Sequence, residues 1–104
     1  MTKFGVHTGL QQTSPAELQS LWHRIEALGF DWISVWDHLY AATMRPDDPD
    51  CLEAVTMHTA LAMTTERVEV GCLVYSVGFR HPAVIAKAVT AIDLLSGGRA
   101  AVGL

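Results

Sequence analysis

The sequence has no apolar run approaching the ~20 residues needed to cross a bilayer, so a membrane-spanning protein is not expected. Its first residues, MTKFGVHTGL, lack the long apolar stretch and small-residue cleavage site of a signal peptide. Basic residues form no stripe and the net charge is −4, which argues against nucleic acid as a partner. Only two cysteines occur, Cys51 and Cys72, without CxxC or zinc-type spacing, and they indicate reduced thiols in a cytoplasmic protein.

Within this composition, strand-like and helix-like runs alternate along a chain of 104 residues, half of them hydrophobic. That length and composition predict a packed globular core and at most one domain of modest size. Strands are predicted over 3–9, 30–36, 67–78 and 100–104, and helices over 14–28, 50–64 and 81–95. Strands that alternate with helices and are apolar on both faces predict parallel β/α units joined by right-handed crossovers.

Local signals mark the first predicted helix most clearly. Ser14 is expected to be its N-cap, with Pro15 at the first helical position and Glu17 completing a capping box. Gly29 is expected to end the helix. Its apolar residues recur at helical spacing and predict a buried stripe of Leu18, Leu21, Trp22, Ile25 and Leu28.

The other two helices carry weaker start and stop signals. Asp50 is the expected N-cap of the second helix, and His81 with Pro82 is expected to begin the third. The sequence SGGR at 96–99 is expected to end the third helix. The predicted buried stripe of the second helix consists of Leu52, Val55, Thr59 and Met63.

Two architectures fit parallel β/α units. A Rossmann or flavodoxin-like sheet usually has a Gly-rich phosphate turn after its first strand, but GVHTGLQQTS contains no GxGxxG. A (β/α)8 barrel needs ~250 residues. We therefore expect residues 1–104 to form a single partial domain, the first four strands and three helices of a TIM barrel. Such a unit would be a truncated barrel, a gene fragment, or a half-barrel that pairs with another copy, because a fourth strand left at the edge would be exposed.

Polar residues follow the first three predicted strands. Functional groups of a β/α barrel cluster where strands end and the following loops begin. This rule selects His7 and Thr8 after the first strand, Asp37 and His38 after the second, and the segment Ser76 to Arg80 after the third. All of them are expected at one rim.

His38 is the leading candidate for catalysis, since imidazole can accept or donate a proton near neutral pH. Asp37 could fix its tautomer, although adjacent strand residues point to opposite faces and need not touch. The alternative is a His38 that caps the loop backbone. His7 either lines a substrate pocket or packs at the barrel mouth, and both interpretations stay open. His23 and His58 lie within predicted helices and indicate surface or packing positions.

Four stretches together resemble the N-terminal half of the luciferase-like monooxygenase family. They are GFDWISVWDH, LEAVTMHTALAMTTERVEVG, FRHPAVIAKAVTAIDLLSGGR and VGL, in that order along nearly the whole chain. The resemblance is to the deazaflavin-dependent (coenzyme F420) oxidoreductase branch in particular. It implies a (β/α)8 barrel about three times this length, and a homodimer in many members.

The resemblance also implies roles for single residues. His38 in VWDH would match the histidine that faces the flavin-like ring and handles the proton during hydride transfer. Asp37 would help to shape the cofactor pocket. A non-prolyl cis peptide that supports the ring would fall near Leu73–Val74 in GCLVYS, a strand in which Gly71 already suggests a bulge. Ser76 would sit near the polar edge of the ring.

The resemblance implies F420 rather than FMN as the cofactor, because family members that use FMN more often have other residues in place of this Asp-His pair. With F420, the implied reaction is hydride transfer to or from a small organic substrate; with FMN, it would be a monooxygenation. In relatives, the cofactor phosphates are held by loops after later strands, so residues 1–104 alone are expected to bind cofactor weakly or not at all.

Two further alternatives compete with these enzymes. One is a metal-dependent hydrolase in which His7 and His38 share an ion. Such barrels usually begin with a paired HxH motif, whereas VHTGL has one histidine, so we predict no metal site. The other is a half-barrel fragment or assembly without catalytic activity of its own.

Overall fold

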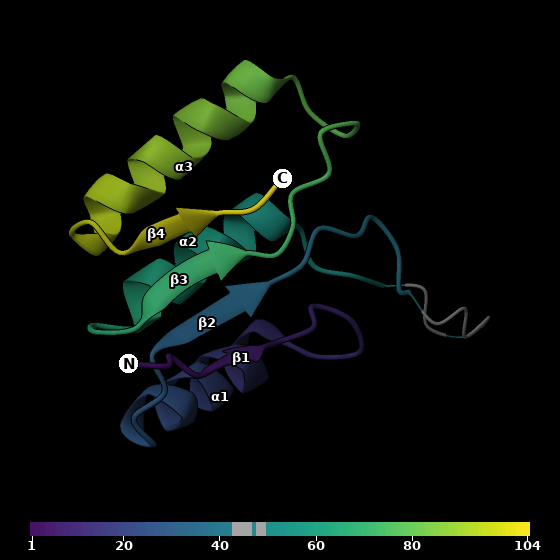
Figure 1. Ribbon diagram of the computed structural model, residues 1–104. Helices are drawn as coiled ribbons and strands as arrows, with labels where there is room; N and C mark the ends of the chain where they lie inside the picture. Colours follow the sequence, from purple (N-terminus) through teal and green to yellow (C-terminus); the bar gives the residue numbers. More distant parts are fainter. Residues whose placement is uncertain (43–46, 48–49) are drawn as a thin grey trace.

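The structure is a computed structural model that describes residues 1–42, 47 and 50–104. Four parallel strands form one sheet in the order β1-β2-β3-β4, and their arrows in Figure 1 point to the same side. The elements are β1 (Gly5–His7), α1 (Pro15–Ala27), β2 (Trp32–Val35), α2 (Ala54–Thr64), β3 (Glu69–Cys72), α3 (Pro82–Ser96) and β4 (Ala100–Val102). This arrangement confirms the predicted fold class, because four sequential parallel β/α strands are half of a (β/α)8 barrel.

The core lies between the sheet and the helices, which pack side by side in the order α1, α2, α3 (Figure 1). The sheet contributes every second side chain of β2 and β3 to this core. These are Ile33, Val35, Val70 and Cys72, which are all buried. None of the helices in the described part of the chain covers the opposite face of the sheet (Figure 1). Among the described residues, no helix is long and apolar enough to cross a membrane.

Helix α1 begins as predicted. The Ser14 hydroxyl accepts the Glu17 N–H at 3.2 Å, and the Glu17 carboxylate accepts the Ser14 N–H at 2.7 Å, which completes the capping box. The predicted stripe is partly wrong. Leu21 and Leu28 are exposed, and Glu26 is buried in their place with Leu18, Trp22 and Ile25.

Helix α2 begins later than predicted, and Glu53 rather than Asp50 is its N-cap. The Glu53 carboxylate accepts the N–H groups of Val55 at 3.1 Å and Thr56 at 2.7 Å. Because the start moves by three residues, the helix buries a different stripe from the predicted one. The buried residues are Ala54, Met57, His58, Leu61 and Ala62.

The ends of α3 confirm the prediction. The His81 ring accepts the Ala83 N–H through Nδ1 at 3.2 Å, and Pro82 follows at the first helical position. Gly97 ends the helix with a φ of 70°, a left-handed conformation that glycine adopts without a steric penalty.

Strand β3 is shorter than the predicted 67–78. It ends at Cys72, and the Leu73–Val74 peptide bond just beyond it is cis. The residues after it form turns that lie along the edge where the strands end. The apolar pattern beyond Cys72 therefore belongs to a loop rather than to a strand.

At the opposite edge, Arg99 joins the end of α2 to the start of β4. Its five N–H donors all have oxygen partners, at 2.8 to 3.0 Å. These are the carbonyl oxygens of Ala62, Thr65, Val68 and Ser96 and the hydroxyl of Thr65. Two of the carbonyls belong to the last turn and C-cap of α2, which has no basic residue of its own in that turn.

We expect Arg99→Lys to lower the free energy of unfolding by about 2 kcal/mol, because lysine has three donors and leaves buried carbonyls unpaired. Urea unfolding followed by circular dichroism measures the change. Arg24→Lys, at an exposed position of α1, is the matched control and should change it by less than about 0.5 kcal/mol. Equal stabilities of the two variants would refute the role given to Arg99.

Candidate active site

The residues selected from the sequence meet at the edge where the strands end. His7 is the last residue of β1, Asp37 and His38 follow β2, and the cis bond follows β3. Parallel strands bring these positions together because all their carboxyl ends lie at the same edge.

The cis peptide lies at the predicted bond, Leu73–Val74. Hydrogen bonds tie its neighbourhood to the strands on both sides. Leu73 donates its N–H to the Val35 carbonyl at 2.8 Å, and Tyr75 donates to the Gly103 carbonyl at 2.8 Å. The side chains of Leu73 and Val74 stay exposed, by 54% and 45%, so two apolar groups face outward at the rim.

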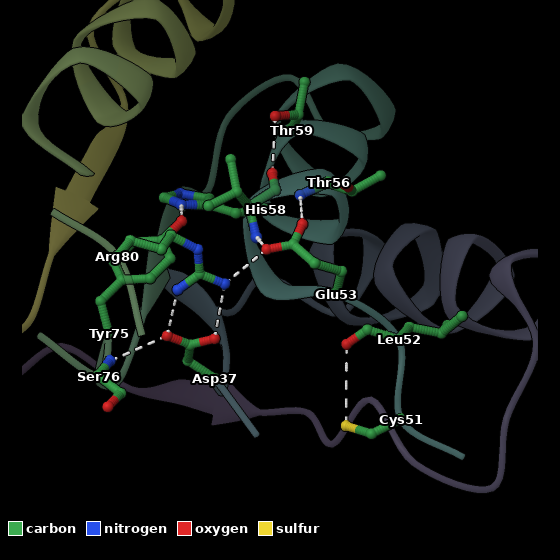
Figure 2. A network of polar contacts seen from close by, with 11 residues as sticks. Asp37, Cys51, Leu52, Glu53, Thr56, His58, Thr59, Tyr75, Ser76 and Arg80 are labelled. Atoms are coloured by element: carbon green, nitrogen blue, oxygen red, sulfur yellow. Dashed lines mark hydrogen bonds and ion pairs between the residues drawn. The ribbon is translucent and has the colours of Figure 1, made fainter. Parts of the chain in front are cut away.

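Asp37 is buried beneath the segment that follows β3, and both its oxygens are occupied (Figure 2). Oδ2 accepts the Ser76 N–H at 2.9 Å and Arg80 Nη1 at 2.6 Å, while Oδ1 accepts Arg80 Nη2 at 2.9 Å. The pairing with Arg80 is bidentate, the strongest geometry for this ion pair. Asp37 thus points toward Arg80 and Ser76.

Arg80 also reaches a second carboxylate. Its Nη2 donates to Glu53 Oε1 at 2.6 Å, and its guanidinium carbon lies 5.8 Å from the centre of the Tyr75 ring. Its hydrogen bonds to Asp37 raise the pKa of Arg80 above the ordinary value and outweigh burial. Burial by itself raises the pKa of Glu53, but the N–H groups of Thr56 and Arg80 among others outweigh it, and the net direction is down.

Tyr75 and His58 form a buried pair under this cluster (Figure 2). The Tyr75 hydroxyl lies 2.9 Å from His58 Nδ1, and His58 Nε2 lies 3.1 Å from the Val70 carbonyl oxygen. A carbonyl only accepts, so Nε2 carries the proton and Nδ1 accepts from the tyrosine. Burial lowers the pKa of His58 and favours this neutral ring. His58 is therefore a packing residue, as predicted.

His7 and His38 both contact the ring of Trp36. The ring centres of His38 and Trp36 are 5.0 Å apart and those of His7 and Trp36 6.0 Å apart, both edge to face. His7 Nδ1 lies 2.8 Å from the Ser34 hydroxyl, which orients its ring. His38 is exposed, and Asp37 is directed away from it toward Arg80.

The open face of the sheet is hollowed beside these residues. The hollow has a volume of about 260 Å³ and an apolar floor, with Ser34, Gly71, Leu73 and Gly103 in its lining. A Cβ at Gly103 would come within 3.0 Å of both the Cys72 carbonyl and Val74 Cγ1, so glycine keeps the surface beside the cis bond open. Exposed apolar side chains next to the half-buried Ser76 fit a flat ring with one polar edge.

The hydrolase alternative lacks support in this geometry. Within residues 1–42, 47 and 50–104, no group of three or more His, Cys, Asp or Glu side chains could hold a metal ion. The indole of Trp36 contacts both His7 and His38. The sequence at Asp47, Asp48 and Asp50 lacks the dense, regularly spaced oxygen ligands of a calcium site, and Asp48 lies outside the described residues.

The sequence did not indicate the roles of three residues in this cluster. Arg80 was only the last residue of a candidate segment, Glu53 was assigned inside a helix, and Tyr75 was placed within a strand. The carboxylate partners of Arg80 lie 27 and 43 residues away along the chain, and His58 lies 17 residues from Tyr75, so no local spacing reveals them. The available signal was an arginine directly after the rim segment, next to a buried acid at the end of a strand.

Comparison with known proteins decides the family. The family model described as luciferase-like monooxygenase matches residues 1–104. The chain belongs to the luciferase-like monooxygenase family. Its members' fold is the barrel predicted from the resemblance, of which this chain forms four strands.

One family relative is the F420-dependent glucose-6-phosphate dehydrogenase of Amycolatopsis mediterranei, 34% identical over all of this chain and 31% of its own length. The solved monooxygenase RslO1 from Streptomyces bottropensis is 28% identical, with a TM-score of 0.76 over 98% of this chain and 32% of that one. An F420-dependent secondary alcohol dehydrogenase, in complex with an F420-acetone adduct, has a TM-score of 0.85 at 24% identity over 97% and 31%. This last likeness shows the fold alone. The chain thus spans about a third of the relatives' length.

Proposed function

We propose that the protein carrying this chain is an F420-dependent oxidoreductase, in which this chain supplies the proton-transfer and ring-supporting part of the site. The observation that supports this most is that His38 and the exposed apolar pair Leu73 and Val74 lie at the same edge of the sheet, just after the paired parallel strands β2 and β3. Within the family, the dehydrogenase relative and the alcohol dehydrogenase neighbour are both named as F420-dependent. The exposed apolar pair beside Ser76 fits the cofactor ring, as described above.

Each residue of the rim then has a role. Leu73 and Val74 would lie against the ring of F420, and Ser76 would meet its polar edge. F420, when bound against these residues, would supply the hydride acceptor for the substrate carbon. His38 accepts the hydroxyl proton of the substrate at a ring nitrogen, so that an alcohol becomes a carbonyl compound. Asp37 shapes the pocket indirectly, through the Ser76 N–H that it holds.

The substrate class we propose is a small molecule with a CH–OH group. The names of the two F420-dependent proteins, a glucose-6-phosphate dehydrogenase and a secondary alcohol dehydrogenase, share that group. His7 would line the substrate pocket, with its ring held by Ser34 on the open face of the sheet. Its 6.0 Å ring contact with Trp36 would keep it on the same side as His38.

The alternative is an FMN-dependent monooxygenase. The likeness to the monooxygenase RslO1 favours it, at a higher identity than the likeness to the alcohol dehydrogenase. The protein that carries this chain can be titrated with F420 and, separately, with FMN. Absorbance follows the binding and distinguishes the two candidate cofactors. We expect F420 to bind at micromolar concentration and to be reduced when glucose 6-phosphate or 2-propanol is supplied. Binding of FMN alone would favour the monooxygenase, and binding of neither would refute both.

Residues 1–104 by themselves are expected to bind F420 at least about 100-fold more weakly than the protein that carries this chain, since the family resemblance implies that loops after later strands hold the cofactor phosphates. The same titration on this segment measures the difference. Micromolar binding by the segment would show that those loops are dispensable. Binding by the protein that carries this chain but not by the segment would agree with a half-barrel segment that has no activity of its own.

The proposal includes a homodimer and a cytoplasmic location. The homodimer follows from the family resemblance, and sedimentation of the natural protein tests it. The location follows from Cys51 and Cys72, which are both free thiols.

A further inference from the structure

Arg80 connects three segments that meet at the rim. It belongs to the loop that follows β3, and it donates to Asp37 at the end of β2 and to Glu53 at the start of α2 (Figure 2). The exposed fraction of the side chain is 16% for Arg80, 1% for Asp37 and 46% for Glu53. The ion pair between Arg80 and Asp37 is therefore buried, whereas the pair with Glu53 reaches the surface.

The buried pair controls the backbone that carries the cis bond. The same Asp37 oxygen that accepts Arg80 Nη1 accepts the Ser76 N–H, two residues beyond Val74. On the other side of Ser76, the Tyr75 N–H is held by the Gly103 carbonyl, and its ring lies under the guanidinium. The segment from Leu73 to Arg80 is thus fixed at both ends and in its middle.

Charge and bidentate geometry together make this arrangement depend on Arg80, because a lysine at position 80 would keep the charge but lose the bidentate pairing with Asp37. Asp37 is a buried carboxylate, and removal of its cation leaves an unpaired charge in a site of low dielectric constant. Arg80 is the only cation that an ion pair places on Asp37 among the described residues. An altered Arg80 would therefore move Asp37, and with it the Ser76 amide.

We propose that Arg80 is a positioning residue for the cofactor site, which acts through Asp37 to hold Ser76 and the Leu73–Val74 peptide in place. This inference rests on the proposed function, because it assigns to that segment the support of the F420 ring. Arg80 itself does not need to touch the cofactor. Its effect should appear in cofactor affinity and in the mobility of the loop more than in the global stability.

The matched control is Arg99, a guanidinium with five hydrogen bonds at the other edge of the sheet. Arg80→Lys and Arg99→Lys make the same chemical change, and both remove hydrogen bonds from a well-anchored site. We compare them with the unmodified natural protein well below the unfolding midpoint of every form. Hydrogen–deuterium exchange of the peptide 73–80 reports on the loop, and titration with F420 reports on the site.

We expect Arg80→Lys to raise the Kd for F420 about tenfold and to speed exchange in 73–80. Arg99→Lys should lower the unfolding midpoint and leave both quantities unchanged. If Arg80→Lys fails to fold, Glu53→Gln loosens the same cluster from its exposed side and should produce a smaller change in the same direction.

Three results would overturn the inference. Unchanged affinity and exchange in Arg80→Lys, with the unmodified protein binding F420, would refute the role of Arg80 alone. Equal effects of Arg80→Lys and Arg99→Lys on the Kd for F420 would show that Arg80 acts on the site only through the overall stability of the protein. Failure of the unmodified protein to bind F420 would refute the proposed function, and the inference with it.

Discussion

Replacement of His38 by alanine should reduce kcat of the natural protein by a factor of about 10² to 10⁴, the usual contribution of a general acid or base. The structure gives His38 no other task that would explain such a loss. Its side chain is exposed, and its described contact is the edge of Trp36 at 5.0 Å. The unfolding midpoint should therefore change little, because an exposed side chain contributes little to burial.

His23→Ala is the matched control for this experiment. His23 is also exposed, but it lies in α1, which ends at Ala27 on the side of the sheet covered by helices. The control should leave kcat and the Kd for F420 unchanged. Steady-state reduction of F420 with glucose 6-phosphate or 2-propanol gives kcat for each variant. A His38→Ala enzyme with full turnover would remove His38 from the mechanism.

Elements whose signals are local were predictable. Ser14 and Glu17 are three residues apart and form the capping box that their spacing predicts. His81 caps α3 in the same way, with a partner two residues further along the chain. The position of the cis peptide was also predicted, but from the family resemblance; nothing in the strand pattern around Gly71 would identify that bond.

The incorrect predictions concern residues whose positions depend on partners far away along the chain. Asp50 was predicted because its residue type is preferred at a helix N-cap, yet the structure uses Glu53. Glu53 is selected where it also meets Arg80, 27 residues later. The apolar residues after Cys72 continue a strand pattern, although Tyr75 packs on His58 and Arg80 instead of extending the sheet. Long-range polar contacts of this kind are what a single sequence conceals.

Charged residues have different roles at the two edges of the sheet. At the carboxyl edge, Asp37 and Arg80 fix a loop that we assign to the cofactor. At the amino edge, Glu26 and Arg99 bind backbone groups of the turns that enter β3 and β4. In β/α barrels, the carboxyl edge carries function and the amino edge carries stability. Substitutions at the two edges should therefore separate into losses of affinity or turnover and losses of stability.

Glu26→Ala should show the larger loss of stability, about 3 kcal/mol in the free energy of unfolding. The Glu26 carboxylate is buried at the end of α1 and accepts three successive backbone N–H groups, from Glu66 at 3.0 Å, Arg67 at 2.7 Å and Val68 at 3.0 Å. Alanine leaves all three donors without this partner. For a small domain, the expected loss is a large fraction of the total stability. Urea unfolding at pH 7 measures it.

Glu26→Gln isolates the charge and makes the effect depend on pH. Burial by itself raises the pKa of the Glu26 carboxyl, but the N–H donors of Arg67, Val68 and Glu66 outweigh it and lower the pKa from its ordinary 4.5. A lowered pKa in the folded state means that the carboxylate stabilises the protein above pH 4.5 and that this stability is lost as the pH falls through the folded pKa. The difference between the unmodified protein and Glu26→Gln should thus be full at pH 7 and shrink in acid. Glu66→Gln, the same change at an exposed neighbour, should show no such trend, and a pH-independent difference for Glu26→Gln would contradict the role of its charge.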